Sequence, residues 1–181
     1  MTALFYADVG RLFLPFVDPV WVGDPHHFEH FDTRRQELTQ EVVRIERLIR
    51  RMRGGSQSYL VQGHDGRFYI AKFTGNPQGN RTLINECITA RLLAQLGVST
   101  PHLVALAYDG SSLNDRALFR IGTREIPVDS GLHLGSLCPA NPDKQAIFDF
   151  LPHKLLANTI NLEDFAAVLV MDTFLGQADR R

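Results

Sequence analysis

The sequence predicts an α+β fold in which an antiparallel sheet and one helix are followed by further helices. Two apolar runs, 59–62 and 67–73, are joined by Gly63-His64-Asp65-Gly66. Asp-Gly between such runs indicates a β-hairpin, because glycine accepts the positive φ that tight turns need. A helical pattern then covers 80–96, where apolar residues recur on one side that includes Leu83, Cys87 and Ala90, with Glu86 on the polar side. Further strands are predicted at 103–108, 118–121 and 125–128.

The last part of the chain is predicted to be helical. Asn141-Pro142 has the pattern of an N-cap followed by proline, and opens a helix to about Phe150. Two more helices are predicted, at 152–158 and from about 162 to 174. The last of these is apolar nearly all round, so we expect it to be central to its lobe.

Residues 1–42 form an extension whose role the sequence does not define. Its apolar stretch, 12–22, is interrupted by prolines and is shorter than the ~20 residues of a membrane span. It also lacks the basic lead and cleavage site of a signal peptide. We expect a helix over 33–41 and a strand over 43–50. The helical spacing of the apolar residues by itself would extend the helix through 43–53, whereas Val43-Arg44-Ile45 alternates as a strand does.

A histidine cluster in this extension raises the question of a metal site. His26 and His30 would share a helix face, with Glu29 beside them. Pro25 argues against a regular helix, and no further ligand set is evident. We therefore favour a solvated polar loop and predict no metal here.

Composition restricts the class of protein. The chain has 44% apolar and 22% charged residues and a net charge of −1, which is typical of a globular protein. That charge gives no general reason to expect nucleic acid or membrane partners. The arginines between 44 and 53 favour a solvated face over a nucleic-acid stripe, because no stacking aromatics are interleaved with them. Two cysteines are too few for a disulfide framework, so a cytoplasmic location fits.

The residues that could carry chemistry begin in the stretch before the hairpin. Gly54 and Gly55, followed by Ser56 and Gln57, could approach phosphate oxygens closely and point backbone N–H groups at them. Lys72 follows on the second strand, and Glu86 lies 14 residues further on, in the predicted helix. A strand lysine on the phosphates, held by a helix carboxylate, is the arrangement of protein kinases.

Side chains two apart on a strand share a face, so Ile70 should point the same way as Lys72. Lys72 could then reach the phosphates of ATP while Ile70 lies nearer the base, as an apolar roof for adenine.

These segments resemble the HipA-like kinases of bacteria. The similarity runs from about Val43 to the C-terminus and is carried by MRGGSQSYLV, DGRFYIAKFTGNPQGNR, NE at 85–86, GLHLGS at 131–136 and LGQADRR at 175–181. It implies a kinase-like N-terminal lobe over 43–130 and the start of an incomplete helical C-terminal lobe over 131–181. Residues 131–136 would be a loop near the junction of the lobes, with His133 as a structural histidine.

The resemblance also assigns a role to Asp179. This residue matches the aspartate that orients or deprotonates the acceptor hydroxyl, although an exposed terminal acid is the alternative. The magnesium ligands of the family are expected beyond Arg181. The function implied is transfer of the ATP γ-phosphate to a hydroxyl, on a protein or a small molecule. The alternative is a truncated or degenerate kinase fragment that binds nucleotide or a partner, and we expect the chain alone not to turn over ATP at a kinase-like rate.

Overall fold

The computed structural model describes residues 5–8, 11–13, 42–98, 100–113, 115–150 and 162–175. The fold in these ranges is α+β, with mostly antiparallel strands and two helices. Four predicted features lie outside the described residues. They are the helices over 33–41 and 152–158, the histidine cluster at 26–30, and Asp179.

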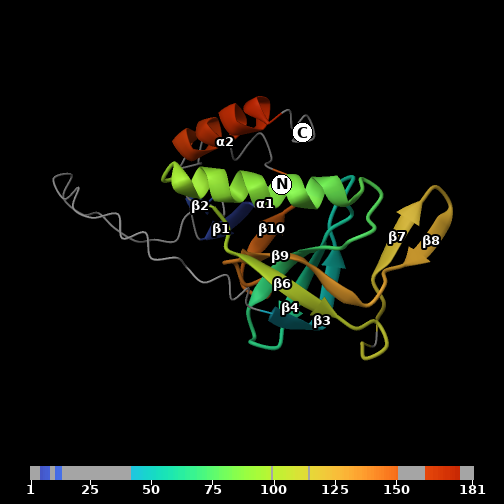
Figure 1. Ribbon diagram of the computed structural model, residues 1–181. Helices are drawn as coiled ribbons and strands as arrows, with labels where there is room; N and C mark the ends of the chain where they lie inside the picture. Colours follow the sequence, from blue (N-terminus) through green and yellow to red (C-terminus); the bar gives the residue numbers. More distant parts are fainter. Residues whose placement is uncertain are drawn as a thin grey trace.

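The centre of the molecule is a closed five-stranded barrel (Figure 1). Its strands are β3 (Val42–Arg51), β4 (Tyr59–Gly63), β5 (Phe68–Lys72), β9 (Gly131–Cys138) and β6 (Leu103–Tyr108), in that order around the barrel. Neighbours are antiparallel except at the closure, where β3 pairs with β6 in parallel. The predicted hairpin is confirmed as β4 and β5, and the strand expected over 43–50 is β3.

The other elements surround this barrel. β1 (Phe5–Asp8) pairs with β2 (Arg11–Phe13) and with β10 (Ala146–Phe148), so part of the N-terminal extension belongs to a small sheet. β7 (Leu118–Ile121) and β8 (Arg124–Pro127) form a separate hairpin. α1 (Asn80–Gln95) lies across one end of the barrel, and α2 (Leu162–Phe174) packs beside it (Figure 1).

The core fills the inside of the barrel. Phe73, which immediately follows β5, is fully buried there, and its ring packs against Tyr59, Tyr108, Phe119 and His133. Tyr69 and Ala71 face the same interior, because alternate residues of a strand point to the same side. Phe68 and Ile70 therefore face outward into a second apolar cluster with Met52, Leu60, Cys138 and Ala140.

The prediction of a loop at 131–136 is wrong. These residues begin β9, which pairs with both β5 and β6, so the barrel continues beyond the lobe boundary expected at residue 130. The resemblance implied a loop in this stretch, but Gly135 is required by the packing of a strand. A Cβ atom on Gly135 would lie 2.5 Å from Cγ of Leu106 and 2.9 Å from Cγ2 of Val104. The strand is stable here because neighbouring side chains occupy the space that glycine leaves.

The predicted helix from Asn141 to Phe150 is also wrong. Asn141 does start a turn, since its side-chain oxygen accepts a hydrogen bond from the Asp143 N–H at 2.8 Å and its carbonyl accepts from Gln145 at 2.9 Å. The chain then leaves the turn and pairs with β1 as β10. Pairing with the distant strand β1 overrides the local helical signal. The sequence shows the local signal but not the distant pairing.

The helix predicted from 162 to 174 is confirmed as α2, but its central position is not. Val168 and Asp172 are buried, whereas Leu169, Val170 and Phe174 are exposed. In the described part of the chain α2 packs against α1, and one neighbouring helix covers only one face of an all-round apolar helix. Neither described helix is long and apolar enough to cross a membrane. Cys87 and Cys138 are both free thiols.

We predict that Gly135→Ala lowers the free energy of unfolding by about 1–3 kcal/mol, because the added methyl group overpacks the barrel against Val104 and Leu106. Urea unfolding followed by circular dichroism measures the change. Ser136→Ala, one residue along the same strand and on the opposite face, is the matched control and should cost less. Equal stability of the two variants would show that the barrel has room at Gly135.

Candidate functional site

The centre of the candidate site is an ion pair between β5 and α1. Nζ of Lys72 donates to Oε2 of Glu86 at 2.6 Å. Only 6% of the Lys72 side chain and 4% of the Glu86 side chain are exposed. The pair predicted from a separation of 14 residues is therefore formed, in a region from which water is largely excluded.

Local structure explains how the two charges meet. Lys72 faces outward from the barrel, on the same face of β5 as Phe68 and Ile70, and Glu86 reaches it from α1. The buried side of α1 carries Leu83, Glu86, Ala90 and Leu93, whereas Ile84 and Ile88 are exposed. The prediction of Glu86 on the polar side of the helix is thus wrong. A carboxylate can occupy the apolar side here because Lys72 neutralises its charge.

The glycine loop, residues 52–58, leads from β3 into β4. The Met52 N–H donates to the Ser58 carbonyl at 2.8 Å and closes the loop, and the Gln57 N–H donates to the Gly54 carbonyl at 3.2 Å. Gly54 has a φ of 134°, a conformation that side chains strongly disfavour. Gly55 lies against the loop before α1, since a Cβ atom there would be 2.5 Å from Nε2 of Gln78. The loop therefore folds over the segment that connects Lys72 to α1.

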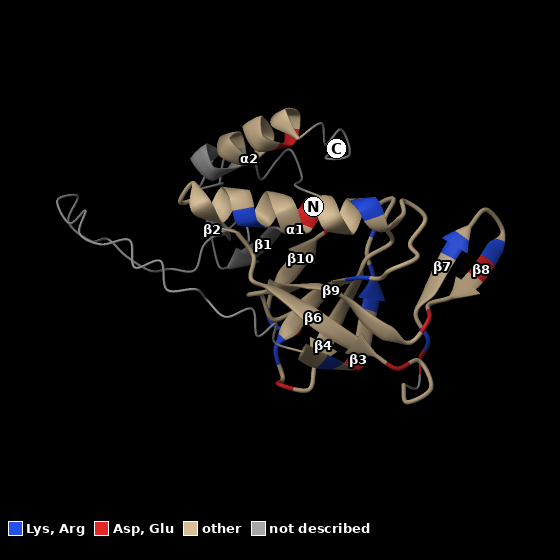
Figure 2. Ribbon diagram, in the orientation of Figure 1, with Lys and Arg blue, Asp and Glu red and all other residues tan. Residues whose placement is uncertain are grey.

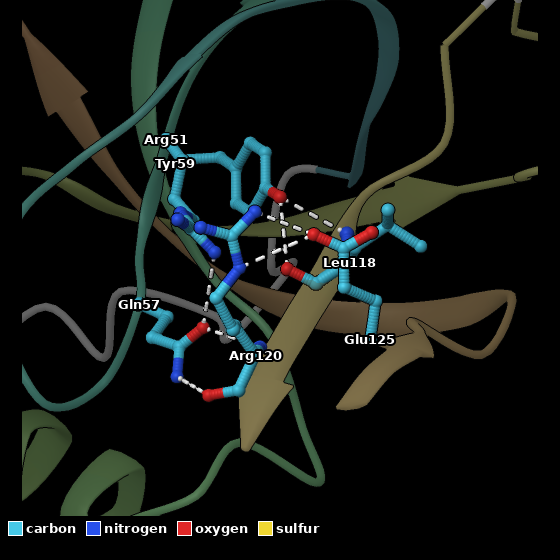
Figure 3. Close-up of polar contacts among 6 residues, drawn as sticks. All are labelled: Arg51, Gln57, Tyr59, Leu118, Arg120 and Glu125. Atoms are coloured by element: carbon cyan, nitrogen blue, oxygen red, sulfur yellow. Dashed lines mark hydrogen bonds and ion pairs between the residues drawn. The ribbon is translucent and has the colours of Figure 1, made fainter. Parts of the chain in front are cut away.

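Side chains from two directions hold the glycine loop. Oδ2 of Asp149 accepts from the Arg53 N–H at 3.1 Å, while Oδ1 accepts from Arg50 at 2.7 Å. At the other end, the Gln57 amide makes two hydrogen bonds with the backbone of Arg120 in β7, both of 2.7 Å (Figure 3). Sequence reasoning missed Asp149 and Arg120, because nothing in the residue pattern links the loop to positions 96 and 63 residues away.

The side chain of Gln57 is consequently engaged within the protein. The sequence placed Gln57 among the nucleotide-binding residues together with Gly54, Gly55 and Ser56. In the structure its Oε1 and Nε2 both bond Arg120, and Arg51 also reaches Oε1 at 3.5 Å. Ser56 bonds Ser58 through their hydroxyl groups at 3.0 Å. The backbone groups of Gly54, Gly55 and Ser56 are then the part of the loop that could bind a ligand.

Ile70 shares a face with Lys72 as predicted, but this face is covered. The Ile70 side chain is 1% exposed and packs among Met52, Leu60, Cys138 and Ala140. An adenine ring could contact Ile70 only after a neighbour such as Met52 moved.

Basic residues gather around the glycine loop. Figure 2 shows them at the end of β3, at the start of α1 and on the β7–β8 hairpin, where the sequence has Arg51, Arg53, Arg81, Arg120 and Arg124. Of the arginines between 44 and 53, Arg44, Arg47 and Arg53 are exposed as the solvated face predicts, whereas Arg50 and Arg51 are partly buried and bond Asp149 and Gln57. Their positive charge favours an anion near the loop, although the chain has a net charge of −1.

His133 holds the end of the lysine strand. Its Nδ1 accepts from the Thr74 N–H at 3.1 Å and lies 3.1 Å from the Thr74 hydroxyl, while Nε2 donates to the Asp129 carbonyl at 3.1 Å. A backbone N–H can only donate, so Nδ1 carries no proton and the neutral ring has its proton on Nε2. Burial lowers the pKa of His133, and the nearby Asp129 opposes that shift only in part. His133 is thus a structural histidine.

Metal ligands are not gathered in the described residues, where no group of three His, Cys, Asp or Glu side chains could hold an ion. Comparison of the chain with protein-family models, with curated proteins and with solved structures found no match. The interpretation of the site therefore depends on its own geometry.

We predict that Lys72→Met destabilises the protein by about 3–5 kcal/mol, because the substitution leaves the Glu86 carboxylate buried without its partner. The double variant Lys72→Met/Glu86→Leu should recover most of this loss, since it buries no unpaired charge. Urea unfolding of the wild type, both single variants and the double variant gives the coupling energy. If the two single losses simply add in the double variant, the side chains are not coupled as a buried pair.

We predict that His133 makes stability depend on pH. Its pKa in the folded protein lies below the value of 6.5 for an ordinary histidine, so the unfolded chain binds the proton more readily. The contribution is fully present above pH 6.5 and is lost as the pH falls from there through the folded pKa. Protonated Nδ1 would also face the Thr74 N–H.

The free energy of unfolding, measured from pH 8 to pH 5, should fall less steeply in His133→Gln than in the wild type. His102→Gln, at an exposed histidine, is the control and should keep the wild-type slope. A wild-type slope in His133→Gln would contradict the assignment.

Proposed function

We propose that this chain carries the nucleotide-binding lobe of a HipA-like kinase, which uses ATP to phosphorylate a hydroxyl group. The observation that carries the proposal is the buried pair of Lys72 with Glu86, formed between a strand and a helix directly after a glycine loop. The order of loop, hairpin, strand lysine and helix glutamate is the order of parts in a protein-kinase nucleotide site.

Each part has a role in the proposed reaction. Lys72 binds the α- and β-phosphates, and Glu86 orients its ammonium group, so that the charge is positioned before the nucleotide arrives. Backbone N–H groups of Gly54, Gly55 and Ser56 bind phosphate oxygens. Magnesium, when bound with the nucleotide, neutralises charge on the phosphates. Asp179, outside the described residues, is proposed to face the acceptor hydroxyl.

Two further features support this function. The arginines near the glycine loop, apart from Arg120, which pairs with Glu125, would attract an anionic ligand to that end of the barrel. A mostly antiparallel set of strands joined to α1 through the Lys72–Glu86 pair is consistent with the N-terminal lobe that the resemblance implies.

One observation favours the second candidate function, a module that binds without turnover. Ile70 is 1% exposed, and Met52 and Leu60 fill the space where the base would lie against it. A degenerate kinase that serves as an interaction module would have no need to open this face. The two functions differ in whether phosphate is transferred.

We predict that the chain binds a fluorescent ATP analogue, mant-ATP, with Mg²⁺, and that Lys72→Ala weakens binding on the order of 10–100-fold, through loss of a charge-assisted hydrogen bond to phosphate. Lys144→Ala, at an exposed lysine, is the matched control and should bind as the wild type does. Because Lys72→Ala leaves Glu86 unpaired, the double variant Lys72→Met/Glu86→Leu provides a second, more stable test and should bind as weakly. Equal binding by all variants would contradict the proposed site.

Phosphate transfer separates the two candidate functions. The purified chain is incubated with radiolabelled ATP and Mg²⁺, and label on the protein or on an added acceptor is measured. Transfer that Lys72→Ala abolishes supports a kinase. Binding of mant-ATP without any transfer is expected of this chain under either function, because the magnesium ligands of the family are not among the residues assigned here, so only a positive transfer result separates the two.

A further inference from the structure

In the glycine loop, Gln57 has a positive φ although it is not glycine. Its φ is 49°, and it is the only residue other than glycine with a positive φ among the described residues. A side chain in this left-handed region carries a steric cost, which persists only where surrounding contacts enforce the conformation. The contacts of Gln57 therefore show what holds the loop in its shape.

The shortest of these contacts are two hydrogen bonds to a single residue of another element; Arg51 also reaches Oε1 at 3.5 Å, and the Gln57 N–H donates to the Gly54 carbonyl at 3.2 Å. Nε2 of Gln57 donates to the Arg120 carbonyl at 2.7 Å, and Oε1 accepts from the Arg120 N–H at 2.7 Å (Figure 3). The amide pairs with the backbone of β7 much as a neighbouring strand would. Such a pair fixes the position and the orientation of Gln57 together, because both bonds are lost if the residue turns.

The hairpin that receives Gln57 is itself attached to the barrel. The hydroxyl of Tyr59, two residues further along, donates to the Leu118 carbonyl at 2.9 Å and accepts from the Leu118 N–H at 3.0 Å (Figure 3). Arg120 and Glu125 form an ion pair across the hairpin. β7 is thereby a fixed support for the loop.

The opposite end of the loop is attached independently. Asp149, whose side chain is only 11% exposed, accepts from the Arg53 N–H at 3.1 Å. Gly54, Gly55 and Ser56 lie between the two attachments. Asp149 and Gln57 thus hold the two ends of the segment whose backbone groups are proposed to bind phosphate.

We propose that Gln57 is a positioning residue that holds the glycine loop in its phosphate-binding shape by bonding it to the β7–β8 hairpin. The inference rests on the proposed function, because it assigns phosphate to the Gly54–Ser56 backbone. Gln57 does not touch the nucleotide in this arrangement. It sets the direction of the N–H groups before ATP binds, which reduces the ordering cost of binding.

The test compares ligands that differ only in their phosphates. Gln57→Leu removes both hydrogen bonds, and Gln57→Gly removes the bonds together with the strain. Both variants should bind mant-ATP with Mg²⁺ more weakly, on the order of tenfold, because two hydrogen bonds no longer hold the loop. Both should bind mant-adenosine, which has no phosphates, as the wild type does. Gln62→Leu makes the same change at a glutamine on β4 and should leave both affinities unchanged.

Two results would overturn the proposal. Gln57→Gly binding mant-ATP as well as the wild type would show that the backbone conformation suffices without the tie to Arg120. Equal weakening of mant-ATP and mant-adenosine would show that Gln57 only stabilises the fold.

Hydrogen exchange gives a measurement that does not require nucleotide. In Gln57→Leu the amides of residues 53–58 should exchange faster, while those of β5 keep the wild-type rate. Unchanged exchange in the loop overturns the proposed positioning even if nucleotide binds. If the wild type binds no mant-ATP, both the proposed function and the assignment of phosphate to the loop fail. The hydrogen-exchange rates then decide by themselves whether Gln57 fixes the loop.

Discussion

The buried pair of Lys72 and Glu86 is the interaction on which the rest of this structure depends. A lysine and a glutamate with only 6% and 4% of their side chains exposed would each be strongly unfavourable alone. The pair therefore requires α1 to approach the Lys72 end of β5 in one rotational setting, with Glu86 turned inward. That setting determines which residues of α1 are buried, and it explains why Ile84 and Ile88 are left exposed.

The barrel supplies the rigidity that such a pair needs. Phe73 and Tyr69 anchor β5 from inside, and His133 bonds Thr74 directly after the strand, so Lys72 emerges from a segment held on both sides. β9 completes this support by pairing with β5 along its length, which is possible because Gly135 lets the side chains of Val104 and Leu106 pack closely. One face of β5 thus packs inside the barrel, and the opposite face carries the charged Lys72.

The glycine loop is arranged differently from the ion pair. Its shape depends on hydrogen bonds from elements that are distant in the chain, with Asp149 at one end and the backbone of Arg120 at the other. A loop held at its ends keeps the backbone between them, Gly54 to Ser56, in a defined path. This combination of a neutralised buried lysine and a supported glycine loop is what the proposal of phosphate binding rests on.

The sequence by itself determined the elements whose signals are local. Asp65-Gly66 marked the β4–β5 hairpin, the apolar period marked α1, and the nearly all-round apolar run over 162–174 marked α2. The spacing of Lys72 and Glu86 placed them on a strand and a helix that could meet. Only the tertiary structure decided that 131–138 and 146–148 are strands, since their pairing partners lie far away in the chain. It also decided that Glu86 lies on the buried side of α1 and that Gln57 bonds β7. The physical reason is the same in each case. The conformation is stabilised by a partner from another element, namely a pairing strand, Lys72 or the backbone of Arg120, and the local sequence does not show which distant element it will meet.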